Sequence, residues 1–108
     1  MKGKYKAAFI LPIGTKKVLG ENGWEFETSN RLSLQIKEHL IDVLKLKFLE
    51  SYLQIYCFMS EDIKMSVSYD DKNEIENIYF QVYNDKLTML TDLFIASGIA
   101  NESELFIP

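Results

Sequence analysis

The residues of this chain that could carry out chemistry are few and widely spaced. His39 is the only histidine and Cys57 the only cysteine, so the chain cannot supply a familiar zinc ligand set. A general base needs a nucleophile within reach, and the sequence pairs neither a serine nor a cysteine with His39. We interpret His39 as a structural or rim residue and Cys57 as a small core residue. The sequence therefore predicts no catalytic residue, no metal site and no cofactor.

The acidic residues are densest in the segment YDDKNEIE, residues 69–76. This segment lacks the alternating oxygen ligands, the central glycine and the terminal glutamate of an EF-hand loop, so it does not predict a calcium site. Short polar segments between strand-like runs usually form turns, and we interpret this one as a solvated hairpin tip. The sequence also has no glycine-rich phosphate-binding motif. The pattern of carboxylates therefore does not predict an enzyme.

Length and composition indicate a single domain covering residues 1–108. The chain has 108 residues, 47% of them apolar and 26% charged, which suffices for one hydrophobic core. The formal net charge of −4 argues against binding nucleic acid by neutralising phosphates. A single cysteine excludes an intrachain disulfide, and no segment approaches the ~20 apolar residues that cross a membrane. We therefore expect a cytoplasmic protein without membrane contact.

The periodicity of the apolar residues divides the chain into strands and helices. Strand-like runs occupy residues 5–11, 24–28, 52–59, 63–69, 76–83 and 104–108. A helical pattern follows Asn84 and Asp85, which suit a helix N-terminus, and Gly98 suits its C-terminal cap. The predicted order is β-β-α-β-β-β-α-β. With so few helices, this order predicts an α+β fold, in which two helices pack on one face of a mainly antiparallel sheet.

The segment of residues 31–49 fits two secondary structures. As a strand it would pair with residues 24–28, but the apolar residues of the two strands would then lie on opposite faces. As a helix it gathers its apolar residues on one side, and Ser29 or Asn30 can serve as its N-cap. We therefore predict that the first helix lies here.

Two pentapeptides share one pattern, YLQIY at 52–56 and YFQVY at 79–83. Side chains alternate along a strand, so each pentapeptide divides into an apolar face and a Tyr/Gln face. The apolar side chains of the first strand, including Leu53, Ile55 and Cys57, need the helices as partners. The Tyr/Gln side chains would then lie on the helix-free face of the sheet. The residues expected there are Tyr52, Gln54, Tyr56, Tyr79, Gln81 and Tyr83.

An exposed sheet face of this composition fits a binding surface. Tyrosine offers a large contact area at a low cost in conformational entropy and is enriched at protein interfaces. Tyrosines also stabilise exposed sheet faces without a partner, and this plainer interpretation stays open beside the first. If the face does bind a partner, the neighbouring carboxylates Asp70, Asp71, Glu74 and Glu76 would form its charged rim.

These features lead to one hypothesis of function, a small acidic protein-binding module without catalytic activity. Its most concrete version is a bacterial immunity (antitoxin-like) protein, which blocks a basic toxin domain such as a nuclease by means of aromatic anchors and steered association. Three alternatives stay open. One is a sensor or enzyme that holds a small molecule between sheet and helices, and another is nucleic-acid binding through the aromatic face. The third is a structural role, including self-association as a homo-oligomer through the tyrosine face.

Overall fold

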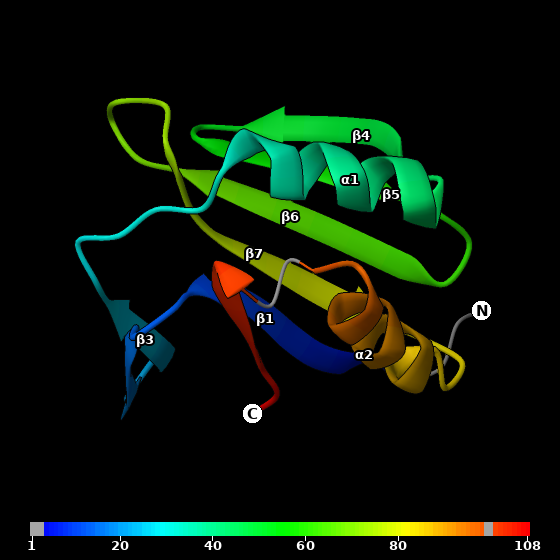
Figure 1. Ribbon diagram of the computed structural model, residues 1–108, viewed down its shortest axis with the longest axis horizontal. Helices are drawn as coiled ribbons and strands as arrows, with labels where there is room; N and C mark the ends of the chain where they lie inside the picture. Colours follow the sequence, from blue (N-terminus) through cyan, green and yellow to red (C-terminus); the bar gives the residue numbers. More distant parts are fainter. Residues whose placement is uncertain (1–3, 99–100) are drawn as a thin grey trace.

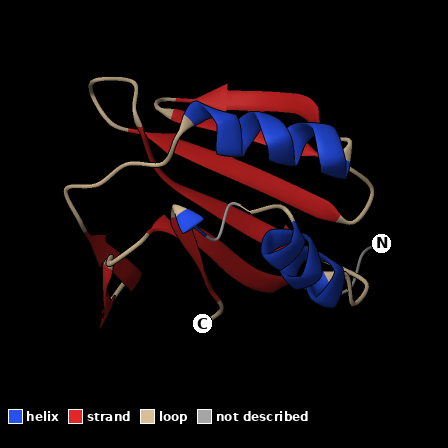
Figure 2. Cartoon of the chain, viewed as in Figure 1, coloured by secondary structure: helices blue, strands red, loops and turns tan. Residues whose placement is uncertain are grey.

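The computed structural model describes residues 4–98 and 101–108 of the chain. Among these residues, the main sheet has six strands in the order β4-β5-β6-β7-β1-β8, and every neighbouring pair is antiparallel. Two helices lie on one face of this sheet, and β2 and β3 form a separate hairpin (Figure 1 and Figure 2). The elements are β1 (Lys6–Pro12), β2 (Lys16–Gly20), β3 (Gly23–Glu27), α1 (Leu34–Leu44), β4 (Lys47–Tyr52), β5 (Ile55–Met59), β6 (Ile63–Tyr69), β7 (Ile75–Val82), α2 (Leu87–Ala96) and β8 (Ser103–Phe106).

This architecture confirms the predicted α+β class with two helices on one face of an antiparallel sheet. Ile36 and Leu40 of α1 join the same core cluster as Leu90 and Phe94 of α2. The order of elements contains two strands more than predicted, β2 and β4, and is β-β-β-α-β-β-β-β-α-β. Neither of the described helices is long and apolar enough to span a membrane.

The centre of the hydrophobic core lies on β6 and β7, beneath both helices. Met65 pairs with Phe80 and Val67 with Ile78, and all four side chains are fully buried. Ala8 of β1 lies on the other side of Phe80. Burying a side chain of this size stabilises the fold by about 1.5–3 kcal/mol. Because a one-residue slip would turn all of these side chains away from the helices, their burial fixes the register of the three strands.

The first helix was predicted correctly in type but wrongly at both ends. α1 begins after Ser33, whose backbone is extended (φ −76°, ψ 151°), so the expected caps Ser29 and Asn30 lie upstream of the helix start. Lys45 ends the helix in the left-handed conformation (φ 55°), and the chain then enters β4. The apolar residues after Lys45 continue the helical spacing, which conceals the reversal of the chain there.

The second helix confirms the predicted C-terminal cap and corrects the predicted N-terminus. Gly98 has φ +78° directly after the C-cap residue Ser97, a conformation that favours glycine. Asn84 and Asp85 both adopt left-handed conformations (φ 53° and 58°) before the helix begins. The side-chain amide of Asn84 donates to Asp62 Oδ1 at 2.6 Å, so it ties this turn to the β5–β6 turn.

The β2–β3 hairpin packs on the helix-free side of the sheet, beside β1 and β8. The ring centroid of Phe26 lies 4.9 Å from that of Phe9, and the ring of Trp24 lies 4.8 Å from that of Phe106. An isolated two-stranded hairpin is marginally stable in water, so these aromatic contacts hold it in place. They also cover this end of the helix-free face.

Candidate functional site

The β4–β5 hairpin lies at one edge of the main sheet (Figure 1). Exposed large apolar side chains concentrate on this hairpin. Leu53 at its turn is 82% exposed and Tyr52 beside it is 71% exposed. Large apolar side chains that gather in water on one element often mark an interaction site. We define the hairpin surface as the exposed residues Phe48, Leu49, Tyr52, Leu53, Ile55 and Tyr56. Phe48 and Tyr56 lie on the helix side of the sheet, whereas Tyr52 and Ile55 lie on the helix-free side.

The hairpin reverses at Leu53 and Gln54, inside the pentapeptide that was predicted to be part of one strand. Tyr52 pairs with Ile55 across this turn, and Leu53 has a left-handed backbone (φ 55°). A non-glycine residue in this conformation costs about 1–2 kcal/mol, and turns normally place Gly, Asn or Asp there. Leu53 thus combines backbone strain with an apolar side chain in water, and neither helps the isolated chain to fold. Strain of this kind concentrates at functional sites.

The predicted Tyr/Gln face is wrong at β5, because the side chains of this strand point to the opposite faces from those predicted. Tyr56 pairs with Val67 and therefore lies on the helix side of the sheet, because directly opposite residues share a face. Cys57 is buried as expected, but it pairs with Ser66 on the helix-free side. Apolar residues occupy both faces of β5, so the alternation of side chains alone could not show which face points toward the helices. The pairing with β6, whose two faces differ clearly, decides which side chains of β5 point toward the helices.

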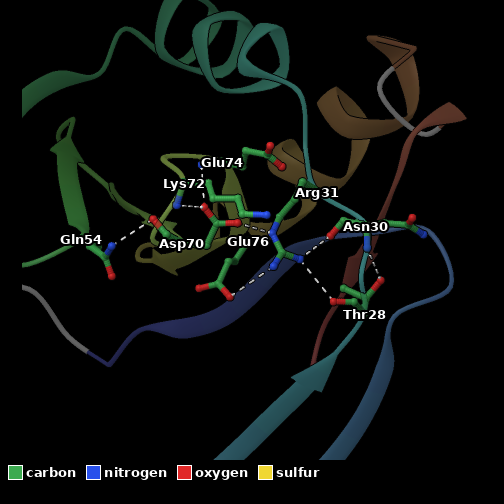
Figure 3. Close-up of polar contacts among 8 residues, drawn as sticks. All are labelled: Thr28, Asn30, Arg31, Gln54, Asp70, Lys72, Glu74 and Glu76. Atoms are coloured by element: carbon green, nitrogen blue, oxygen red, sulfur yellow. Dashed lines mark hydrogen bonds and ion pairs between the residues drawn. The ribbon is translucent and has the colours of Figure 1, made fainter.

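The segment between β6 and β7 forms a tight turn that Asp70 holds together (Figure 3). Asp70 Oδ1 accepts the backbone N–H groups of Lys72 at 2.8 Å and Glu74 at 2.9 Å, while Oδ2 accepts from Arg31 Nε at 2.8 Å. These bonds favour the charged carboxylate and lower the pKa of Asp70 to about 2, with the Arg31 hydrogen bond as the largest cause. Asp70 is therefore an anchor of the turn, and Arg31 compensates its charge.

Gln54 connects the hairpin surface with this acidic turn (Figure 3). Its side-chain Nε2 donates to the backbone carbonyl oxygen of Asp70 at 3.0 Å. Its backbone carbonyl oxygen accepts a hydrogen bond from the backbone N–H of Tyr69 at 2.9 Å. The carboxylates of Asp71 and Glu74 are exposed beside it. The structure thus brings one group of the predicted site residues to the same end of the molecule, namely Tyr52, Gln54, Tyr56, Asp70, Asp71, Glu74 and Glu76.

We expect Asp70→Asn to destabilise the protein at neutral pH and to flatten its acid unfolding. The folded-state pKa of about 2 lies below the ordinary value of 3.8, so the stabilisation is present above the ordinary value and is lost as the pH falls toward 2. Urea unfolding at a series of pH values measures this loss. Asp71→Asn, at an exposed neighbouring position, is the matched control and should keep the wild-type pH profile. Equal profiles for the two variants would contradict the anchoring role.

Tyr79, Gln81 and Tyr83 lie apart from the hairpin surface and are half-buried on the helix-free face. The ring of Tyr79 lies 4.9 Å from that of Phe9, and the ring of Tyr83 lies 5.9 Å from that of Tyr5. Burial raises the pKa of Tyr79 to about 12, with a hydrogen bond to Tyr5 as the second cause. These rings pack against the first strand, so the interpretation as sheet stabilisation fits them better than an open docking face.

Sequence reasoning missed Phe48, Leu49 and Leu53 as surface residues. Phe48 and Leu49 fell in the segment predicted to be helical, and Leu53 was assigned to the helix-covered face of a strand. The dense apolar run from Phe48 to Tyr56 was the available signal, since it exceeds what one edge hairpin can bury. Only the position of the hairpin at the sheet edge shows that these side chains are exposed.

His39 and Cys57, the residues most capable of chemistry, lie apart in the structure. No group of His, Cys, Asp and Glu side chains within residues 4–98 and 101–108 has a geometry that could hold a metal ion. His39 lies half-buried on α1, whereas the Cys57 sulfur lies 3.5 Å from Ser66 Oγ on the helix-free side of the sheet. The sheet separates these two side chains, so they cannot act together.

Two small cavities in the described part of the chain lie at the ends of the helices. One of about 250 Å³ adjoins the start of α1, between Arg31 and Tyr69, and one of about 220 Å³ lies between the end of α1 and the start of α2. Pockets for small molecules usually measure about 300–1,000 Å³. The two cavities therefore give little support to a small-molecule function.

No family model, no curated protein and no solved structure matches this chain.

Proposed function

We propose that this protein is a small acidic module that binds the surface of another protein, in the manner of an immunity protein that neutralises a toxin. One observation carries this proposal: the hairpin surface presents a strained, 82% exposed leucine next to a 71% exposed tyrosine. Both side chains are mostly exposed, so their burial contributes little to the stability of the isolated fold. Both suit the role of an anchor that becomes buried when a partner binds.

The hairpin turn is held rigidly enough to serve as a preformed anchor. Gln54, the second residue of the turn, is bound through both its side chain and its backbone to the segment 69–70. Asp70 is in turn fixed by Arg31 and by the backbone of its own turn. A contact residue that is already ordered loses less entropy on binding, so more of its burial energy appears as affinity.

The charges around the anchor favour a basic partner. Asp71 and Glu74 are exposed in the turn next to the hairpin and outnumber the exposed Lys72 between them, whereas the charge of Asp70 is compensated by Arg31. The chain as a whole carries a formal net charge of −4. Exposed charge of one sign accelerates association with a partner of the opposite sign and contributes more to the rate than to the final affinity. Aromatic and aliphatic anchors inside an acidic border therefore suit the basic surface of a nuclease-type toxin.

A rescue experiment tests the proposal. The product of the adjacent reading frame is expressed in host cells alone and together with this chain, and cell survival is measured. We expect the product to be toxic alone, and co-expression to restore growth. Calorimetric titration of the purified pair should show a complex. A non-toxic neighbour, or a toxic one that does not bind this chain, would contradict the proposal.

We expect Tyr52→Ala combined with Leu53→Asn to weaken this complex by about a hundredfold or more, the scale of removing two central anchors. Asparagine tolerates the left-handed conformation, so the second substitution removes the apolar anchor without straining the turn. The matched control is Leu19→Asn on β2, where the leucine is 65% exposed but distant from the hairpin surface. Equal affinities of the wild type and the hairpin variant would show that the hairpin surface is not the binding site.

A further inference from the structure

The outer edge of β4 is free in the part of the chain that the structure describes. β4 is the terminal strand of the six-stranded sheet, and all of its residues are exposed. Such an edge presents unpaired N–H and C=O groups that can accept another strand. Proteins usually protect an edge with charged residues, and β4 carries Lys47 and Glu50. Whether these two charges protect the edge depends on where they point.

A β-bulge places Lys47 and Glu50 on the same face of β4. Lys47 pairs with Met59 and Glu50 with Cys57, and the register between the two strands shifts between Phe48 and Glu50. Met59 and Cys57 are two residues apart on β5, so they share the helix-free face. In a regular strand, residues three apart point to opposite faces, and only the extra residue of the bulge aligns these two charges.

Because Lys47 and Glu50 share one face of β4, the outer edge of β4 can be complementary to the same edge of a second copy. When two copies of one strand pair antiparallel about a two-fold axis, every contact between two different residues occurs twice. If Lys47 of one copy lies opposite Glu50 of the other, two ion pairs form and Phe48 lies opposite Leu49 on both sides of the axis. We propose that a second copy of this chain pairs with β4 in this register, which joins two six-stranded sheets into one continuous sheet.

Other registers lack this complementarity. A shift by two residues would put Lys47 opposite Tyr52 and lose both ion pairs. A shift by one residue would put Lys47 opposite Ser51, which pairs with Tyr56 and therefore lies on the helix side. Residues opposite each other in a sheet share a face, so that register is excluded.

The dimer and the proposed binding of a partner depend on different residues of the hairpin. The paired segment runs from Lys47 to Glu50 and includes Phe48 and Leu49 of the hairpin surface, whereas the two anchors of the proposed function, Tyr52 and Leu53, lie beyond it at the turn. The dimer therefore stands independently of the immunity role. Separate substitutions also keep the failure of one proposal distinguishable from the failure of the other.

Charge reversal tests the dimer. The mass of the protein is measured by sedimentation equilibrium over a broad range of concentrations, for the wild type, Lys47→Glu, Glu50→Lys and the double variant. Each single reversal turns two attractive pairs into two repulsive ones and should raise the dimer dissociation constant about ten- to thirtyfold. The double variant restores opposite charges and should return to within a few-fold of the wild type.

Controls separate this result from misfolding and from general charge effects. Thermal unfolding should show that all variants remain folded, and Lys16→Glu, at an exposed position on β2, should leave the dissociation constant unchanged. Three outcomes would overturn the proposal: a monomer at all concentrations, a dimer indifferent to both single reversals, or a double variant no tighter than the single ones.

Discussion

Phe80→Ala should lower the free energy of unfolding by about 3–5 kcal/mol. Phe80 is fully buried on β7, between Met65 of β6 and Ala8 of β1 and within the core that both helices cover. Truncation leaves a cavity at the junction of these elements, because the fixed register of the strands prevents the neighbouring side chains from moving in to fill it. Because a domain of this size is stable by only about 5–15 kcal/mol, the variant should lie close to its unfolding threshold. Urea unfolding followed by circular dichroism and by fluorescence measures the loss.

Phe48→Ala is the matched control, since it makes the same chemical change on the same side of the sheet. Phe48 lies at the edge, pairs with Phe58 and is 59% exposed. Its truncation should cost less than about 1 kcal/mol when measured at concentrations where the protein is monomeric. A small loss would show that folding does not require an aromatic residue there, as expected for a contact surface. A loss as large as that of Phe80→Ala would mean that Phe48 belongs to the core.

Phe9→Ala should cost about 2–4 kcal/mol and should act most strongly on the β2–β3 hairpin. The ring of Phe9 contacts Phe26 of that hairpin, Tyr79 of β7 and Phe106 of β8. Without this ring the hairpin loses one of the aromatic contacts that attach it to the sheet, and a two-stranded hairpin is only marginally stable by itself. Hydrogen exchange of the backbone amides should therefore accelerate in β2 and β3 while protection in β6 persists.

Leu19→Ala provides the control for this prediction, because Leu19 lies in the same hairpin but is largely exposed. It should leave the exchange rates of β2 and β3 close to those of the wild type. If Phe9→Ala accelerates exchange equally in all strands, the hairpin is not a separate unit held by Phe9.

The sequence predicted those elements whose two faces differ clearly. The strands around Met65 and Phe80 alternate cleanly between apolar and polar residues, and the structure confirms both them and the α+β class. Three features escaped prediction because local pattern does not determine them. The chain reverses at Lys45 without a glycine, the β4–β5 turn uses Leu53 and Gln54, and β5 carries apolar residues on both faces.

The candidate site was predicted in part for similar reasons. The segment around Asp70 was expected to be a turn with a charged rim, and it is a turn. The role of Asp70 as an anchor depends on Arg31, which lies 39 residues away in the sequence, so no local signal could reveal it. Tyr52 and Tyr56 are both exposed, but on opposite sides of the sheet, because the turn and the phase of β5 were not predictable.

The position of β1 between β7 and β8 affects how the protein can fold during its synthesis. Phe9 of β1 pairs with Tyr79 of β7 and with Phe106 of β8, so β1 can pair with neither neighbour until the chain has been synthesised as far as β7. Successive strands from β4 to β7 are neighbours in the sheet and can close one after another as they emerge. Throughout that time the apolar residues Ala8 and Ile10 have no place to be buried. The nascent chain therefore carries β1 as an unpaired apolar segment until β7 has been synthesised, and a holding chaperone would protect it from aggregation during that time.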